Sequence, residues 1–181
     1  MTKPSVITIS GDPGSGTTTI GQLLSKELNI KMVYVGAIFR ELAGLYDMTL
    51  SEFGKYAENN PDIDHELDTR QVEIAKKGNV ILEGRLSGWM MKKSKIRAFK
   101  VLLTADLDTR VSRVMGRENK SFEQVKEEIL KREACEHERY TDFYDANYQD
   151  QSYYDLIIDT SELTPDEIVK KIIDAMAKYQ D

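Results

Sequence analysis

A glycine-rich stretch near the start of the chain constrains its fold more than any other feature. The β-branched run Val6-Ile7-Thr8-Ile9-Ser10 predicts a buried strand that feeds directly into Gly11-Asp12-Pro13-Gly14-Ser15-Gly16-Thr17-Thr18-Thr19. Apolar residues then recur at helical spacing up to Leu28. Strand, glycine loop and helix follow each other in the order that lets backbone N–H groups at a helix N-terminus surround phosphate oxygens.

The loop matches the phosphate-binding pattern G-x-x-x-x-G-K-[ST] at Gly11, Gly16 and Thr18. It departs from the pattern at Thr17, where a lysine ordinarily places its ammonium on the β- and γ-phosphates. The dinucleotide pattern G-x-G-x-x-G fits poorly, because its third glycine falls on Thr19. The loop therefore predicts a nucleoside triphosphate site with Thr18 as a Mg²⁺ ligand, and an ordinary glycine-rich turn is the alternative. The predicted phosphate-binding residues are Gly11, Asp12, Pro13, Gly14, Ser15, Gly16, Thr17, Thr18 and Thr19.

Strand-like and helix-like patterns alternate along the rest of the chain. Four further apolar runs predict strands over residues 32–35, 80–83, 99–103 and 154–159. Helical patterns lie between them and after them, the last beginning at Thr164-Pro165. Parallel strands need crossover connections, so this alternation predicts an α/β fold with a parallel sheet and helices on both faces. We expect one domain, residues 1–181, with helical insertions at about 37–77 and about 116–147; Trp89, Met90 and Met91 are expected in the core.

Composition and charge exclude several classes of protein. The net charge is −6, which argues against broad contact with a nucleic-acid backbone. No run approaches the roughly 18 consecutive apolar residues of a membrane helix. One cysteine and two histidines leave no disulfide and no Cys- or His-based metal cluster. We expect a cytoplasmic protein with no nucleic-acid or membrane partner.

One acidic residue and several arginines are candidates for phosphate chemistry. Glu83 ends a predicted strand, where it can approach the glycine loop and a bound Mg²⁺; a solvated strand end is the alternative. Arg113 and Arg117 share a helical face, and Arg132 and Arg139 lie seven residues apart on the next helix. Such rows are often solvated surfaces laced with glutamate, but fixed guanidinium groups are also what phosphoryl transfer needs.

Five segments together resemble the archaeal-type cytidylate kinases, which belong to the nucleoside monophosphate kinase group of P-loop proteins. They are the glycine loop, Gly36–Ala43, Ile63–Gln71, the stretch EGRLSGWM at Glu83–Met90, and Arg132–Tyr140. A threonine at the P-loop lysine position also occurs in that family. The resemblance implies a three-layer α/β/α P-loop fold with a five-stranded parallel sheet, a helical acceptor-binding insertion and a helical lid.

The resemblance also implies an activity, the transfer of the γ-phosphate of ATP·Mg²⁺ to CMP or dCMP. We expect a monomer rather than an oligomer. Thr18 and Glu83 would hold the metal. The arginines implied to be catalytic are Arg113, Arg117, Arg132 and Arg139.

The acceptor side is assigned by the same resemblance. Arg40 and Arg85 would grip the acceptor's α-phosphate, while Asp68, Arg70 and Gln71 would read the base, with a solvated helix face as the alternative for these three. Two other functions stay open: a kinase for UMP, AMP or a non-nucleotide alcohol, and a nucleotide-binding switch that does not transfer phosphate, suggested by Thr17.

Overall fold

A computed structural model describes residues 4–116, 120–147 and 149–179 of the chain. Its five strands form one sheet in the order β2-β3-β1-β4-β5, and every neighbouring pair is parallel. The predicted five-stranded parallel sheet is therefore confirmed. The strands are β1 (Val6–Gly11), β2 (Lys31–Tyr34), β3 (Val80–Glu83), β4 (Phe99–Thr104) and β5 (Leu156–Asp159).

The described residues form eight α-helices and one short 3₁₀ helix. Three of the α-helices, α3, α7 and α8, begin with reciprocal capping boxes at Thr49, Ser121 and Thr164, which satisfy backbone N–H groups at each start. The helices are α1 (Thr17–Leu28), α2 (Val35–Leu45), α3 (Leu50–Glu58), α4 (Pro61–Lys77), α5 (Ser87–Lys93), α6 (Leu107–Met115), α7 (Phe122–Tyr144), α8 (Pro165–Lys178) and the 3₁₀ helix η1 (Gln151–Tyr153).

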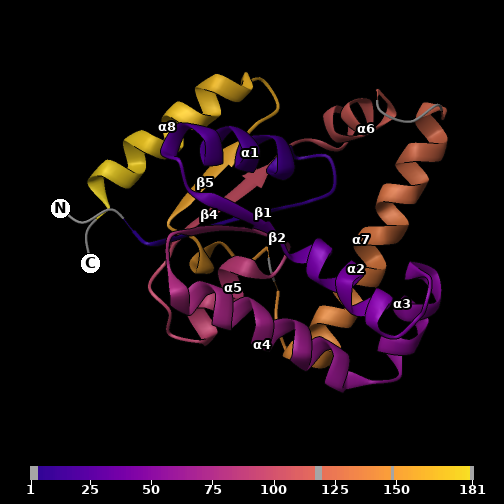
Figure 1. Cartoon of the computed structure of the whole chain (residues 1–181). Helices are drawn as coiled ribbons and strands as arrows, with labels where there is room; N and C mark the ends of the chain where they lie inside the picture. The colour runs from indigo at the N-terminus through magenta and orange to yellow at the C-terminus, as the bar shows by residue number, and fades with distance from the viewer. Residues whose placement is uncertain (1–3, 117–119, 148, 180–181) are drawn as a thin grey trace.

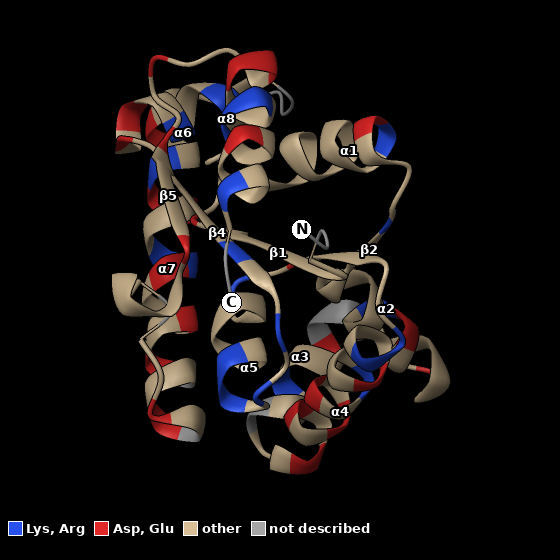
Figure 2. Cartoon of the chain, turned by 90° about the vertical axis from the view of Figure 1, so that its left-hand side faces the viewer, with Lys and Arg blue, Asp and Glu red and all other residues tan. Residues whose placement is uncertain are grey.

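The sheet lies between two layers of helices, with α1 and α8 on one face and α4, α5 and the end of α7 on the other (Figures 1 and 2). The first layer buries Ile20, Leu24 and Ile172 against the sheet. The second layer buries Trp89 and Met91. Both faces of the central strands are thus removed from water, which is why those strands are mainly apolar in the sequence.

Helix α5 is an element that the sequence patterns did not indicate. It has only seven residues, and its first five are all buried, so no polar face alternates with an apolar one. Trp89, Met90 and Met91 pack in the core as expected. Gly88 is required there, because a Cβ at this position would lie 2.6 Å from the Tyr154 ring.

The two insertions stand beside the carboxyl ends of the strands. Helices α2, α3 and α4 close around a small core of their own, with Phe53 fully buried and its ring centroid 4.9 Å from that of Phe39. Helix α6 packs on α7 through Val111, Val125 and Ile129. None of the helices in the described part of the chain combines the length and the apolarity needed to cross a lipid bilayer.

Candidate functional site

The glycine loop connects β1 to α1 in the conformation that its glycines allow. Gly14 and Gly16 have φ angles of +84° and +96°, which side-chain-bearing residues rarely adopt. Gly14 also lies directly against α6, since a Cβ there would be 2.7 Å from the Arg110 carbonyl oxygen. The loop folds back on itself through a hydrogen bond from the Ser15 amide to the Asp12 carbonyl, 3.0 Å long. Its shape therefore depends on glycine at both positions.

Two hydroxyl groups of the first turn of α1 meet a carboxylate at the end of β3. Thr17 Oγ1 donates to Glu83 Oε1 over 2.7 Å, and Thr18 Oγ1 lies 3.4 Å from the same oxygen. Glu83 comes to this place because β3 pairs in parallel with β1, so the two strands end side by side. Hydroxyl and carboxylate oxygens are the hard donors that Mg²⁺ prefers, so this donor set fits the predicted metal.

Two cavities meet beside this cluster. The first, of about 440 Å³, is lined by the glycine loop and by α7. The second, of about 380 Å³, lies between α2, α4 and α7 and is lined by Phe39, Leu67 and Tyr140 among others. Five residues line both cavities and mark their junction: Gly36, Arg40, Glu83, Arg85 and Arg132.

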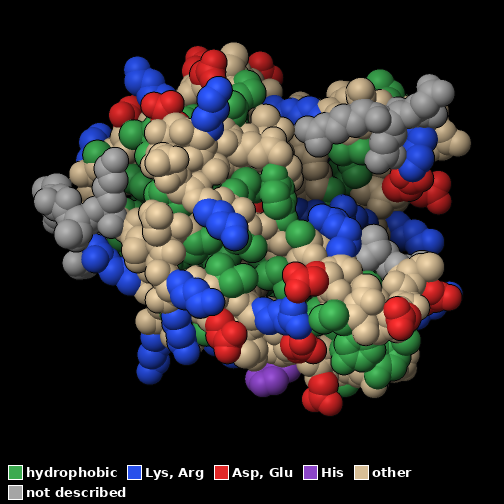
Figure 3. Space-filling model, in the orientation of Figure 1, with side chains coloured by type: hydrophobic (Ala, Val, Ile, Leu, Met, Phe, Trp, Pro, Cys, Tyr) green, Lys and Arg blue, Asp and Glu red, His purple; other side chains and the backbone are tan. Residues whose placement is uncertain are grey.

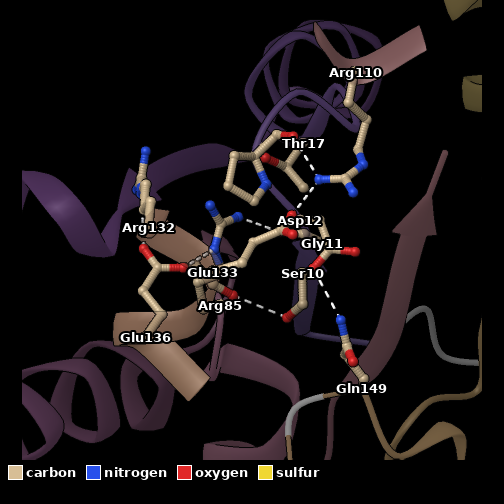
Figure 4. A network of polar contacts seen from close by, with 12 residues as sticks. Ser10, Gly11, Asp12, Thr17, Arg85, Arg110, Arg132, Glu133, Glu136 and Gln149 are labelled. Carbon is tan, nitrogen blue, oxygen red and sulfur yellow. Dashed lines mark hydrogen bonds and ion pairs between the residues drawn. The ribbon is translucent and has the colours of Figure 1, made fainter. Parts of the chain in front are cut away.

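A carboxylate on α7 connects two of the arginines at that junction. Glu136 accepts a hydrogen bond from Arg85 Nε at 2.6 Å and from Arg132 Nε at 2.8 Å. Arg85 Nη1 also donates to the Gly11 carbonyl, so Arg85 lies between the loop and α7 (Figure 4). Burial of Glu136 would raise the pKa of its carboxyl, but the guanidinium groups of Arg85 and Arg132 outweigh it and hold that pKa below its usual range.

Two arginines of α6 contact the other side of the loop. Arg110 is buried; it donates to the Pro13 carbonyl at 3.3 Å and pairs with Glu133 of α7. Arg113 donates to Thr160 Oγ1 at 2.9 Å and to the Thr160 carbonyl at 2.6 Å. Thr160 in turn donates toward the Ser15 carbonyl, 3.1 Å away. Thr160 thus connects Arg113 to the loop in this structure.

Two of the predicted arginines fall outside the part of the chain whose side chains are described. Arg117 lies outside the described residues, and Arg139 belongs to α7 but its side chain is outside the described part. Arg40 is exposed and lines both cavities. The surface view shows Lys and Arg side chains gathered in the recess between the α6–α7 side and the α2–α3 side of the molecule (Figure 3).

The three residues predicted to read the base all belong to α4 but point in different directions. Arg70 pairs with Glu41 at 3.2 Å and with Glu66 at 2.8 Å. Gln71 is buried. Asp68 lines a separate cavity between α4 and α5, and burial raises the pKa of its carboxyl to about 6. The structure does not bring these three side chains together at the junction, and their role in base recognition stays a prediction.

Known proteins share both the sequence and the fold of this chain. The model of the cytidylate kinase-like family matches residues 6–162. The chain belongs to this family. The cytidylate kinase of Methanocaldococcus jannaschii is 44% identical over 177 residues, which cover 96% of this chain and 99% of that protein. The cytidylate kinase of Pyrococcus abyssi is 48% identical over 172 residues, which cover 93% of each.

Solved structures support the fold of this cytidylate kinase-like chain. An uncharacterized protein from Eubacterium ventriosum aligns with a TM-score of 0.76 at 18% identity, covering 96% of this chain and 99% of that one. A shikimate kinase from Bacteroides thetaiotaomicron aligns with a TM-score of 0.62 at 16% identity, covering 96% of each chain. At such low identity these likenesses speak for the fold alone, the three-layer P-loop arrangement predicted from the sequence.

Several residues of the site in this cytidylate kinase-like protein carry little or no signal in the sequence. Glu136 stands four residues after Arg132, a spacing that indicates a pair on one helix face, yet its second contact is to Arg85, 51 positions away. Thr160 follows the last strand, and a polar residue at a strand end was the only available signal. Phe39, Leu67 and Tyr140 carried none, because their patterns are those of ordinary apolar helix positions.

Proposed function

We propose that this protein transfers the γ-phosphate of ATP to CMP, and also to dCMP. The observation that carries the proposal is the junction of the two cavities, where Arg40, Arg85 and Arg132 come from three distant parts of the chain to one place beside the glycine loop. Three guanidinium groups at a shared wall favour a phosphoryl group that moves from one cavity to the other.

The first cavity takes the donor. Backbone N–H groups of the glycine loop and the N-terminus of α1 suit the phosphates of ATP. Thr18 and Glu83 would hold the Mg²⁺ that accompanies them, and this cation would neutralise charge on the β- and γ-phosphates. The 2.7 Å and 3.4 Å contacts between Glu83 and the hydroxyls of Thr17 and Thr18 support this assignment, because they gather oxygen donors at the loop.

The second cavity takes the acceptor. Arg40 and Arg85 at its mouth suit the α-phosphate of a nucleoside monophosphate, and Phe39, Leu67 and Tyr140 offer an apolar and partly aromatic wall for a flat base. The resemblance to cytidylate kinases favours cytosine as that base.

Transfer needs no general base on the protein. The acceptor phosphate is already ionised near neutral pH, so it attacks the γ-phosphorus in line, and the bond to the ADP oxygen breaks as the new bond forms. Arg132, and in the same role Arg113, Arg117 and Arg139, would stabilise charge on the migrating group. In this structure Glu136 balances the charges of Arg85 and Arg132; an incoming phosphate would take over that task.

The decisive experiment is a coupled assay of ADP formation with ATP and each of CMP, dCMP, UMP and AMP. We expect the highest kcat/KM with CMP or dCMP. A higher kcat/KM with UMP or AMP would refute the acceptor assignment. Binding of ATP and CMP without any product in a single-turnover measurement would refute the kinase assignment and favour a nucleotide-binding switch.

A further inference from the structure

Thr17 occupies the loop position where the phosphate-binding pattern has a lysine, and the structure gives its side chain a definite task. The residue is only 8% exposed in the first turn of α1. Its hydroxyl donates to Glu83 Oε1 at 2.7 Å, a shorter contact than the 3.4 Å from Thr18 to the same oxygen. The carboxylate is therefore held more closely by the residue that replaces lysine than by the predicted metal ligand beside it.

Both branches of the Thr17 side chain are used. Its methyl group faces the backbone of Gly11, where a Cβ would lie 3.0 Å from Thr17 Cγ2, while its hydroxyl faces Glu83. A β-branched side chain has few χ1 choices, so the direction of the Thr17 hydroxyl is restricted. The acidic partner is glutamate, one methylene longer than aspartate.

Two arginines bring positive charge to the cavity that Thr17 lines. Arg85 and Arg132 line the same cavity as Thr17 and Thr18, and Arg85 donates directly to the Gly11 carbonyl. The cavity that would take the donor thus has cationic groups beside the loop. A neutral hydroxyl at position 17 leaves the whole charge of Glu83 available to a divalent cation.

We propose that Thr17 is a positioning residue, which holds the Glu83 carboxylate for the divalent cation of the bound nucleotide, so that Thr17 and Glu83 act as a matched pair. This deepens the proposed function and rests on its nucleotide site, not on the identity of the acceptor. A lysine at position 17 would place an ammonium beside Glu83 and compete with the cation for that carboxylate. We therefore expect Thr17→Lys to weaken binding of the divalent cation.

The test measures Mn²⁺ binding to the protein in the presence of ADP and without acceptor. The electron paramagnetic resonance signal of the free ion reports how much Mn²⁺ is unbound. We expect Thr17→Val, which keeps the shape but loses the hydroxyl, to weaken Mn²⁺ binding at least about fivefold, whereas Thr17→Ser stays within about twofold. Thr69→Val, an exposed position of α4, is the matched control and should bind as wild type. Thr17→Ala gives a second hydroxyl-free variant with the same expected loss, should the valine protein fold poorly.

A double-mutant cycle tests the pairing itself. Thr17→Lys should weaken Mn²⁺ binding at least about tenfold and raise the Mg²⁺ concentration needed for half-maximal turnover. Adding Glu83→Asp to Thr17→Lys should recover part of the lost Mn²⁺ affinity, because the shorter side chain withdraws from position 17. Glu83→Asp alone should lower Mn²⁺ affinity. Wild-type Mn²⁺ affinity in both hydroxyl-free variants, or a gain of metal affinity and kcat in Thr17→Lys, would overturn the inference.

The role of Thr17 and the proposed function can fail separately in these experiments. If the Mn²⁺·ADP affinities of the wild type and the variants rank as expected but the wild type phosphorylates no CMP, only the acceptor assignment is overturned. A wild-type protein that phosphorylates CMP while Thr17→Val and Thr17→Ala bind Mn²⁺ normally would overturn only the role of Thr17. If the wild type does not bind Mn²⁺·ADP, both the proposed nucleotide site and the role of Thr17 are overturned.

Discussion

Replacing Gly14 by alanine tests whether the glycine loop is shaped as described. Gly14 has a φ of +84°, and a Cβ at this position would lie 2.7 Å from the Arg110 carbonyl oxygen and 2.9 Å from Arg110 Cβ. A side chain in the left-handed region costs about 1–2 kcal/mol. Overlap with the backbone of α6 adds roughly 1–3 kcal/mol, as overpacking does in protein cores. We expect Gly14→Ala to lose about 2–5 kcal/mol of unfolding free energy.

The same substitution should affect nucleotide binding. Relief of the overlap requires the loop to move away from α6, which pulls the Pro13 carbonyl from the Arg110 guanidinium, 3.3 Å away in this structure. The loop N–H groups would then no longer converge on phosphate oxygens, and we expect ATP affinity to fall at least about tenfold. Urea unfolding followed by the fluorescence of the single tryptophan, Trp89, measures the first effect, and calorimetric titration with ATP measures the second.

Two other glycines separate strain from overlap. Gly16 has a φ of +96°, but a Cβ at this position would have no atom within 4 Å, so Gly16→Ala should lose only the backbone strain of about 1–2 kcal/mol. Gly44, inside α2, also has nothing within 4 Å, and Gly44→Ala should gain roughly 0.5–1 kcal/mol from helix propensity. If Gly14→Ala unfolds at the same urea concentration as Gly16→Ala and binds ATP like the wild type, the described contact with α6 is wrong.

Three further predictions concern the contacts of the site and of α4. Arg132→Ala should lower kcat by about 100-fold or more while the KM for ATP changes little, because the arginine acts on the migrating group. Steady-state kinetics checks this, with Lys131→Ala at the exposed neighbouring position as the control. Thr160→Val should cost about 1–3 kcal/mol in urea unfolding, because Arg113 and two backbone carbonyls lose a buried partner. Burial raises the pKa of Asp68 from 3.8 to about 6, so the folded state binds more protons and stability should fall as pH rises between these values. Asp68→Asn should abolish that fall and stabilise the protein at pH 8 by roughly 1–2 kcal/mol. This value is smaller than the pKa difference alone would give, because solvent screens the half-buried carboxyl. A pH profile of melting temperature that Asp68→Asn leaves unchanged would contradict this prediction.

Local patterns in the sequence were sufficient for most of the fold. Five mainly apolar runs became the five strands, because central parallel strands are buried on both faces and therefore favour apolar residues at most positions. The glycines of the loop indicated its backbone, since positive φ angles such as those of Gly14 and Gly16 favour glycine. Helix α5 escaped prediction, because an almost fully buried helix of seven residues has no amphipathic period.

Patterns in the sequence predicted the chemical groups of the candidate site: a glycine loop for phosphate, a carboxylate at a strand end, and a set of arginines. Which arginines contact the loop depends on how α6 and α7 are placed in the folded chain. Arg110 and Arg113 lie three positions apart on α6, yet Arg110 contacts Pro13 and Glu133 while Arg113 contacts Thr160. Arg132, on α7, contacts Glu136. The pairing of Thr17 with Glu83 spans 66 positions and exists because β3 ends beside β1. Side-chain contacts of this kind depend on strand order and helix orientation, which no local pattern encodes.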